Sequence, residues 1–251
     1  MNDFLSPDKP LLTVMLQSCT VDGVLSKIRG ALALGAEAFG LQIERLPFSD
    51  RNEKAYRRIF AEGGGLPFYV TSYRSGDNKG RTDDELADDL LLLADSGASL
   101  CDVMGDLYSK HPLELTGDPS AIEKQTRLID SLHEKGAAVL MSSHTHTFLP
   151  PERVLEFALE QKRRGADFIK IVTNAADDDE QLQNLAATRL LKKELGAPFL
   201  FLSGGECTIH RRIGWKLGCS MILCVYEHDE LSTKAQPLLS VAKAVRDEMG
   251  F

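Results

Sequence analysis

The sequence lacks the features that mark several common classes of protein. It contains no apolar run of the roughly 18 to 20 residues that a membrane helix needs. Its first residues, MNDFLSPDKP, lack the basic and then apolar layout of a secretory signal peptide. Its five cysteines include no C-x-x-C pair, which argues against a disulfide framework and against a zinc knuckle. We therefore expect a cytoplasmic protein whose cysteines are buried free thiols.

Positive charge is also scarce. The 29 Lys and Arg residues are outnumbered by 37 Asp and Glu residues, which gives a formal net charge of −8. No basic stripe interleaved with aromatic residues is present, and a negative field repels a phosphate backbone, so nucleic acid is not an expected partner. A small anionic substrate would therefore depend on cations that the binding site itself provides.

What the sequence does have is a regular alternation of short apolar segments and longer amphipathic segments, which is typical of βα units and a parallel sheet. Strands are predicted at Leu12–Gln17, Ala38–Arg45, Pro67–Arg74, Ser99–Asp106, Ala137–His144, Asp167–Thr173, Pro198–Ser203 and Met221–Tyr226. A helical pattern follows each of them, at Val21–Leu34, Arg51–Glu62, Asp83–Asp95, Ala121–Lys135, Pro151–Arg164, Asp179–Leu195, Ile209–Leu217 and Gln236–Glu248. The pattern predicts one (β/α)8 barrel (TIM barrel) over residues 1–251.

Glycine supports these boundaries, because several helical segments end in Gly just before the next strand, as in EKGAAVL, RRGADFI, ELGAPFL and KLGCSMI. Glycine at this position supplies the left-handed residue that closes a helix. A doubly wound open sheet is the alternative fold. It would require a Gly-rich turn after an early strand, which the segment MLQSCTVDG does not offer.

In such barrels the active site lies at the carboxyl ends of the strands. The polar residues expected there are Gln42, Glu44, Arg45, Arg74, Asp106, His144, His146, Lys170, Glu206, Arg211 and the segment 227–236, which includes Ser232 and Gln236. Lys170 is the most informative, because it interrupts the apolar run FIKIV. Burial disfavours a charged ammonium and so favours the neutral amine that forms imines. The alternative is a lysine that extends to the barrel mouth and pairs with a carboxylate such as Asp106.

Two histidines end the fifth predicted strand. His144 lies one strand before Lys170 in the expected barrel, where it could move protons on an imine adduct. His144 and His146 also form an H-x-H pair, whose side chains point the same way along a strand and could share a metal ion. A metal-dependent hydrolase is therefore a competing class, although it would need further ligands at other strand ends.

Several separated segments resemble the family of type I 3-dehydroquinate dehydratase, a Schiff-base enzyme of the shikimate pathway built on an aldolase-superfamily barrel. AAVLMSSHTHTFLPP resembles the family's fifth strand, and the resemblance gives the role of catalytic base to His144 and not to His146. GADFIKIV resembles the segment that carries the imine lysine, which assigns this role to Lys170. The likeness extends over nearly the whole length.

The same resemblance implies the substrate contacts. TSYRSGDNKG makes Arg74 the counterpart of a substrate-binding arginine, and TIHRRIGWKLGCS gives Arg211 the substrate carboxylate. LSTKAQP resembles a flexible loop in which a serine and a glutamine touch substrate, here Ser232 and Gln236. Gln42 and Glu44 fall on the second-strand positions that orient ring hydroxyls. The resemblance further implies a homodimer that acts on a small-molecule carboxylate and needs neither a metal nor an organic cofactor.

The sequence departs from the family where the substrate hydroxyls are read. Gln42-Ile43-Glu44 stands where the family has Glu, an aromatic residue and Arg, unless a slip of one residue brings Arg45 into register. With Glu44 in the place of the family's arginine, we expect its carboxylate to neutralise part of the charge of Arg74. Asn78 aligns with the glutamate that supports the histidine, and Met15 aligns with a first-strand serine. Two alternatives therefore stay open, namely a Schiff-base lyase or aldolase for another hydroxylated keto acid, and a non-catalytic binding barrel.

Overall fold

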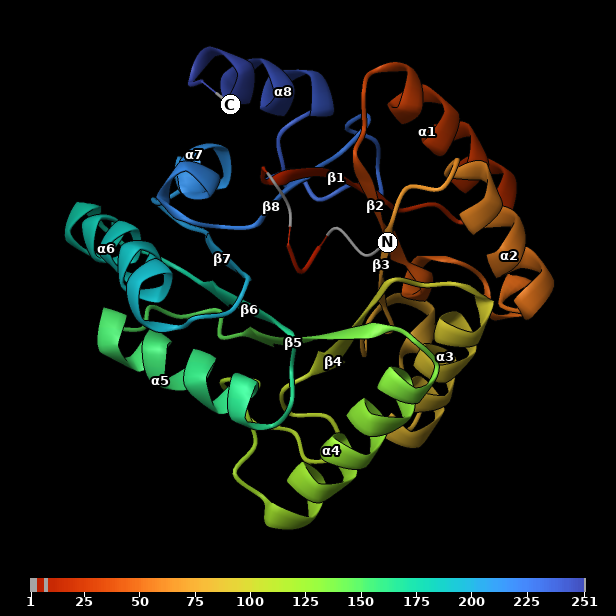
Figure 1. Cartoon of the computed structure of the whole chain (residues 1–251), viewed down its shortest axis with the longest axis horizontal. Helices are drawn as coiled ribbons and strands as arrows, with labels where there is room; N and C mark the ends of the chain where they lie inside the picture. The colour runs from red at the N-terminus through yellow and green to blue at the C-terminus, as the bar shows by residue number, and fades with distance from the viewer. Residues whose placement is uncertain (1–3, 7–8, 251) are drawn as a thin grey trace.

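The computed structural model describes residues 4–6 and 9–250, and it confirms the predicted barrel: a ring of helices surrounds parallel strands (Figure 1). The strands are β1 (Leu11–Leu16), β2 (Ala38–Gln42), β3 (Phe68–Thr71), β4 (Leu100–Met104), β5 (Ala138–His144), β6 (Phe168–Thr173), β7 (Phe199–Ser203) and β8 (Met221–Cys224). The helices are α1 (Val21–Ala33), α2 (Glu53–Glu62), α3 (Asp83–Ser96), α4 (Pro119–Glu134), α5 (Pro151–Arg163), α6 (Asp178–Glu194), α7 (His210–Leu217) and α8 (Leu239–Glu248).

Strands β7 and β8 are the two edges of the sheet, and we call the place where they meet the seam. Hydrogen-bonded neighbours run in the order β7-β6-β5-β4-β3-β2-β1-β8, so within the described residues β7 and β8 form no ladder with each other. Ser220 bridges them instead, because its backbone N–H donates to the carbonyl of Phe199 at 2.8 Å. A cavity of about 10 Å³ lies among residues of β7, α7 and β8.

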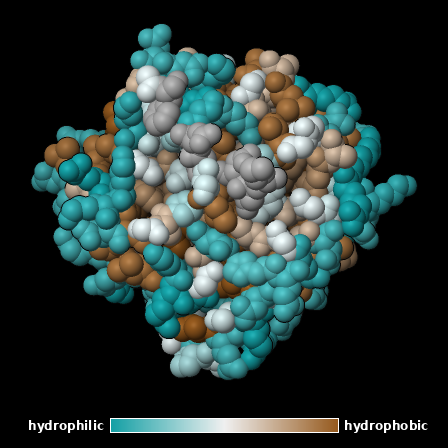
Figure 2. All heavy atoms as spheres, in the orientation of Figure 1, coloured by the Kyte–Doolittle hydropathy of each residue, from teal (hydrophilic) through white to brown (hydrophobic). Residues whose placement is uncertain are grey.

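The sequence forms these elements for local reasons. Strand residues are buried on both faces, as expected for a parallel sheet covered by helices. Helix α3 begins at Asp83 because Thr82 and Glu85 form a capping box, in which each side chain satisfies a backbone N–H of the other residue. The glycines predicted to end four helices all have positive φ, from 59° at Gly196 to 134° at Gly218. Hydrophilic residues occupy most of the periphery seen in Figure 2.

Several boundaries differ from the prediction by one or two residues, and three differ by three residues. Strand β2 ends at Gln42, not Arg45, because the chain turns into a 3-10 helix over Ile43–Arg45 that packs on a second one over Gly76–Asn78. A Cβ on Gly76 would lie 2.1 Å from the carbonyl oxygen of Glu44, so only glycine fits there. This second 3-10 helix follows strand β3, which ends at Thr71 and not at Arg74 as predicted.

The third difference is at the C-terminal helix. Helix α8 begins at Leu239 and not at Gln236, because Leu238 forms a parallel β-bridge with Val225 just before the helix. The N–H of Val225 donates to Pro237 O at 2.9 Å, and the N–H of Leu239 donates to Val225 O at 2.8 Å. The segment before α8 is therefore held against the end of β8.

The cysteines are all free, but the expectation of burial is wrong for one of them. Cys19 is exposed in the loop after β1, whereas the other four are buried. No helix within 4–6 and 9–250 combines the length and apolarity that a bilayer span requires.

Candidate active site

Lys170 occupies a closed polar cage inside the barrel. It points inward from β6, and the residue is only 4% exposed. Its Nζ donates to the hydroxyl of Tyr69 at 2.9 Å and to the hydroxyl of Tyr73 at 2.6 Å, and it lies 3.4 Å from Oδ2 of Asp102. The alternative interpretation of the sequence, in which Lys170 extends to the barrel mouth and pairs with Asp106, is therefore wrong. The carboxylate partner of Lys170 is Asp102, which lies deeper on β4.

The carboxylate of Asp102 accepts hydrogen bonds from three hydroxyl groups. Its Oδ2 accepts hydrogen bonds from Tyr69 and Tyr73, and its Oδ1 accepts one from Ser142 at 2.6 Å. Hydrogen bonds to a buried carboxylate replace the water that it has lost and allow it to keep its charge. Burial and the charge of Asp102 together raise the pKa of both phenols well above the ordinary value, so both tyrosines carry their protons.

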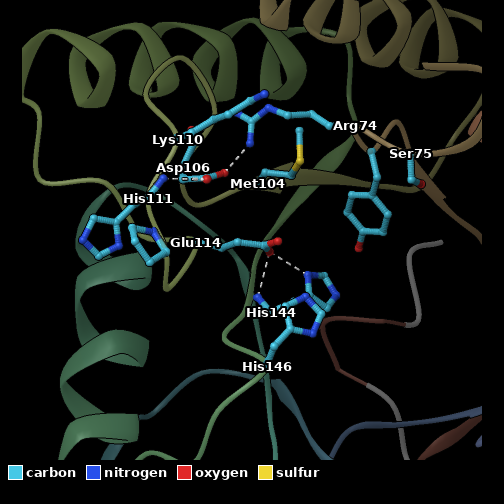
Figure 3. Close-up of a pocket in the computed structure, with 11 residues that line it drawn as sticks. Arg74, Ser75, Met104, Asp106, Lys110, His111, Glu114, His144 and His146 are labelled. Carbon is cyan, nitrogen blue, oxygen red and sulfur yellow. Dashed lines mark hydrogen bonds and ion pairs between the residues drawn. The ribbon is translucent and has the colours of Figure 1, made fainter. Parts of the chain in front are cut away.

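His144 lies one inward-facing position closer to the mouth than Lys170, because Ser142 is the register partner of Lys170 on β5. Its Nδ1 is 2.8 Å from Oε2 of Glu114, and its backbone N–H donates to the same oxygen at 2.8 Å (Figure 3). A carboxylate accepting from Nδ1–H leaves Nε2 as the basic nitrogen. Burial and the nearby charge of Lys170 lower the pKa of His144, and Glu114 opposes that shift. The arrangement favours a neutral imidazole.

Sequence reasoning missed Glu114. The alignment placed the supporting carboxylate at Asn78, but Asn78 is buried elsewhere and donates to the carbonyl of Tyr73 at 2.8 Å. Glu114 comes from the loop between β4 and α4 and has a φ of 47°, a left-handed conformation that is uncommon for a non-glycine residue. A single glutamate in an irregular loop carries no periodic signal, so only the three-dimensional structure could reveal its role.

Arg74 is held by two aspartates. Its Nε and Nη2 each lie 2.7 Å from an oxygen of Asp83. Its Nη1 lies 2.7 Å from Oδ1 of Asp106 (Figure 3). The expectation that Glu44 neutralises Arg74 is therefore wrong, since Asp83 and Asp106 take that role. Contact between Arg74 and a substrate stays a prediction. Arg74 is available for such a contact, because it also lines the cavity in front of His144.

Gln42 and Glu44 bond to each other. Gln42 points into the barrel beside Gln17, with which it shares a side-chain hydrogen bond, and its Nε2 donates to Oε1 of Glu44 at 3.1 Å. Glu44 is 1% exposed, and Thr71 donates to its Oε2 at 2.9 Å. Burial raises the pKa of Glu44. The register pairs Gln42 with Thr71 on β3, and Arg45 ends the 3-10 helix that follows β2.

The residues expected to bind the substrate carboxylate keep unused hydrogen-bonding atoms. Arg211 lies in the first turn of α7, beside β7 and β8. Burial lowers its pKa, and its Nε has no hydrogen-bond partner among the described atoms. Oε1 of Gln236 is likewise buried and unpartnered in that part of the chain. Ser232 lies in the same loop as Gln236, and its backbone N–H donates to Oδ1 of Asp229 at 2.8 Å. Lys27 fixes this loop through an ion pair with Asp229.

A cavity of about 730 Å³ opens in front of His144, a size that suits a small ligand. It is lined by Tyr73, Arg74, Ser75, Met104, Asp106, Lys110, His111, Pro112, Glu114, His144 and His146 (Figure 3). Lys170 is not among these residues, because Tyr73 lies between its Nζ and the cavity. Within the described residues no three His, Cys, Asp or Glu side chains group as metal ligands, so the H-x-H pair gains no third ligand there.

A model of the family described as type I 3-dehydroquinase matches residues 12–246. The chain belongs to the type I 3-dehydroquinase family. Among curated relatives, the 3-dehydroquinate dehydratase of Klebsiella pneumoniae is 28% identical over 203 residues, 78% of this chain and 76% of the relative. Those of Geobacillus sp. and Alkaliphilus oremlandii are 30% and 32% identical, but each match spans only 36% of the relative's length.

Solved structures support the fold of the family member. The 3-dehydroquinate dehydratase of Geobacillus kaustophilus superposes with a TM-score of 0.81 at 16% identity, over 98% of this chain and 93% of the other. The type I enzyme of Clostridium difficile, solved with covalent modified comenic acid, gives a TM-score of 0.82 at 16% identity, over 98% and 94% of the two chains. Likeness at this identity establishes the barrel, whereas the chemistry has to be argued from the site.

Proposed function

We propose that this protein is a type I 3-dehydroquinate dehydratase, a hydro-lyase that removes water from 3-dehydroquinate through an imine of Lys170. The observation that carries the proposal is the burial of Lys170 at 4% exposure beneath a cavity that His144 lines. A lysine amine with a histidine in front of it is the equipment that imine formation and proton transfer require. Membership of the family supplies the substrate.

In the proposed reaction, the amine of Lys170 condenses with the ketone, and the iminium draws electrons from the neighbouring C–H bond. Nε2 of His144 removes that proton, and Glu114 stabilises the imidazolium that forms. The imidazolium then returns a proton to the departing hydroxyl, and water leaves. Hydrolysis of the imine releases 3-dehydroshikimate and restores Lys170.

The polar groups around the mouth are assigned to the rest of the substrate. Arg211 and Gln236 would hold the carboxylate, because each has a buried polar atom without a partner among the described atoms, which a ligand would satisfy. Ser232 lies in the same loop as Gln236. Arg74, Gln42 and Glu44 would orient the ring hydroxyls, although each of these side chains already bonds to neighbouring protein atoms.

Borohydride trapping tests the proposal. The reagent reduces an imine to a stable amine, so incubation with 3-dehydroquinate should leave a covalent adduct on Lys170 that mass spectrometry detects. Lys170→Ala should abolish both trapping and turnover. Lys110→Ala is the matched control, since Lys110 also lines the cavity and should remain dispensable for trapping. An adduct on another lysine, or turnover that survives in Lys170→Ala, would overturn the proposal.

A second candidate is a Schiff-base lyase or aldolase for another hydroxylated keto acid. The observation that favours it is the hydrogen bond between Gln42 and Glu44. By resemblance, these two residues occupy positions where the family has a glutamate and an arginine. A panel of keto acids assayed under identical conditions separates the two. Clear turnover of another keto acid, together with none of 3-dehydroquinate, would establish the second candidate.

We further propose that the chain acts as one catalytic barrel and works as a homodimer in the cytoplasm. Support for the dimer comes from the general prevalence of two-fold oligomers. Light scattering on the purified protein would measure the mass in solution, and cell fractionation would locate it. A monomeric mass or a membrane-associated fraction would contradict these assignments.

A further inference from the structure

Two phenols connect Lys170 to its carboxylate. The direct distance from Nζ to Oδ2 of Asp102 is 3.4 Å, longer than a charge-assisted hydrogen bond of about 2.7–2.9 Å. The hydroxyl of Tyr73 fills this gap, since it accepts from Nζ at 2.6 Å and donates to Oδ2. Tyr69 makes the same pair of bonds, with 2.9 Å to Nζ. The route from the amine to the carboxylate therefore passes through a hydroxyl.

The cage also stabilises a cation. Nζ lies 5.2 Å from the ring centre of Tyr73 and 5.5 Å from that of Tyr69, which are favourable cation–π distances. Two phenol oxygens and a carboxylate surround the three N–H bonds of an ammonium. Such an environment suits Lys170 as an ammonium ion. An ammonium is not a nucleophile, so imine formation requires that one proton leave first.

We propose that Tyr73 is a catalytic residue that relays this proton between the Lys170 ammonium and Asp102. The inference rests on the imine chemistry of the proposed function. The ammonium passes a proton to the hydroxyl oxygen of Tyr73 while the hydroxyl passes its own proton to Asp102. The products are a neutral amine, an unchanged phenol and a protonated carboxyl group. Asp102 thus stores one proton while the amine reacts.

The stored proton is used in the next step. The amine nitrogen forms a bond to the ketone carbon, the carbonyl π electrons move to oxygen, and a proton passes from nitrogen to that oxygen to give a carbinolamine. The relay then runs in reverse, and Tyr73 delivers the proton of Asp102 to the carbinolamine hydroxyl. The C–O bond breaks, water departs and the nitrogen lone pair forms the iminium. Asp102 returns to a carboxylate, so charge and atoms balance.

The geometry favours Tyr73 over the other candidates for this role. Tyr73 has the shorter bond to Nζ and also lines the cavity, whereas Tyr69 is fully buried and does not line it. His144 contacts the ring of Tyr73 edge-on at 5.3 Å between centroids, and its Nδ1 is committed to Glu114. Because burial and Asp102 raise the pKa of Tyr73, the phenol holds a proton at neutral pH and can pass it on.

The test compares Tyr73→Phe with wild type by the rate of borohydride trapping under single-turnover conditions with 3-dehydroquinate. Phenylalanine keeps the ring but removes the hydroxyl. Trapping should slow by about 100-fold at neutral pH, the lower end of what a general acid–base group contributes. Tyr69→Phe should slow it less, since the Tyr73 route remains. Tyr108→Phe is the control, because Tyr108 lies outside the cage and packs on Lys124.

The pH dependence distinguishes a relay from a structural effect. Hydroxide can remove the ammonium proton directly, so the deficit of Tyr73→Phe should shrink as the pH rises toward about 9. A constant deficit at every pH would show that the hydroxyl only shapes the site, and trapping at the wild-type rate would show that no relay is needed. Either result overturns the relay. If wild type itself forms no adduct, the imine chemistry fails, which is a separate outcome.

Discussion

Oε2 of Glu114 lies 2.8 Å from Nδ1 of His144 and 2.8 Å from the backbone nitrogen of the same residue. One oxygen thus fixes both the ring and the end of strand β5 that carries it. Although burial acts in the opposite direction, hydrogen bonds from the ring and the backbone of His144 lower the pKa of Glu114. Glu114 is therefore an anion that orients the imidazole and stabilises its protonated form.

The first prediction concerns this pair. Glu114→Gln keeps an oxygen that can accept from Nδ1–H but removes the charge that raises the pKa of His144. The acid limb of the pH profile of kcat/KM should therefore move to lower pH, and kcat should fall by roughly 10- to 100-fold. Glu123→Gln, on the exposed face of α4, is the control for loss of one negative charge. An acid limb that stays in place would contradict the assignment of Glu114.

The second prediction separates the two histidines. His144→Ala should still form the imine, since Lys170 keeps its amine, but turnover should fall by roughly two to four orders of magnitude. His146→Ala should have a much smaller effect, because His146 lines the cavity without an ion pair to Glu114 in the structure. Trapping and steady-state turnover measured on both variants give the comparison. If the two variants exchange behaviour, His146 is the base.

The third prediction concerns Gln42 and Glu44. Gln42→Glu alone places two carboxylates together in a buried site, and Glu44→Arg alone leaves an arginine facing Gln42, so each single change should destabilise the protein. The double variant would instead place a carboxylate opposite a guanidinium, which is a complementary pair. We expect strong coupling in a double-mutant cycle of unfolding free energies.

The same double variant bears on the substrate. Wild type should turn over 3-dehydroquinate with a KM above that of standard family members, with its imine chemistry intact. The KM of the double variant should be lower by roughly 5- to 150-fold, the range of about 1–3 kcal/mol for a buried polar contact made or lost. The absorbance of the conjugated enone product provides the assay. Ordinary activity in wild type, with no gain in the double variant, would show that these substitutions are compensated elsewhere.

The fourth prediction concerns stability far from the site. Glu37 bonds to Arg246 on α8 and to the backbone of β1. Although burial opposes the shift, hydrogen bonds from Arg246 and Lys9 lower the pKa of Glu37 from 4.5 to about 2. Because the pKa is lower in the folded state, the contribution is present above pH 4.5 and is lost as the pH falls toward 2.

Glu37→Gln should therefore reduce the free energy of unfolding by about 1–3 kcal/mol at neutral pH, and the difference from wild type should vanish in strong acid. Urea denaturation at a series of pH values measures it. Glu248→Gln, which changes an exposed carboxylate at the end of α8, should show little difference at any pH. A deficit for Glu37→Gln that persists unchanged in acid would contradict the linkage.

The barrel could be predicted from the sequence because its signals are local. Apolar segments alternate with amphipathic ones, and glycines such as Gly136 and Gly165 mark where helices end. The burial of Lys170 followed from its place in an apolar strand. The strand ends were harder, since β2 stops at Gln42 only because its turn packs against a second turn at Gly76. That contact lies between segments more than thirty positions apart and has no periodic trace.

The partners of the reacting groups could not be predicted. Asp102, Tyr69 and Tyr73 lie on strands β3 and β4 or just beyond, and they meet Lys170 of β6 only across the closed barrel. An aromatic residue in a strand is usually core packing, so the sequence offered no reason to expect phenols bonded to a lysine. Glu114 was hidden for a related reason, because loop geometry decides where it points.

The seam between β7 and β8 links ligand binding to the cohesion of the barrel. Those strands have no ladder between them in the described part of the chain, and Arg211 lies in the first turn of α7, the helix that packs on both. A carboxylate bound by Arg211 on one side of this junction and by Gln236 on the other would act as a crosslink that the bare sheet lacks. Substrate analogues that carry a carboxylate should therefore slow amide hydrogen exchange in β7 and β8 more than in β3 or β4, and analogues without one should not.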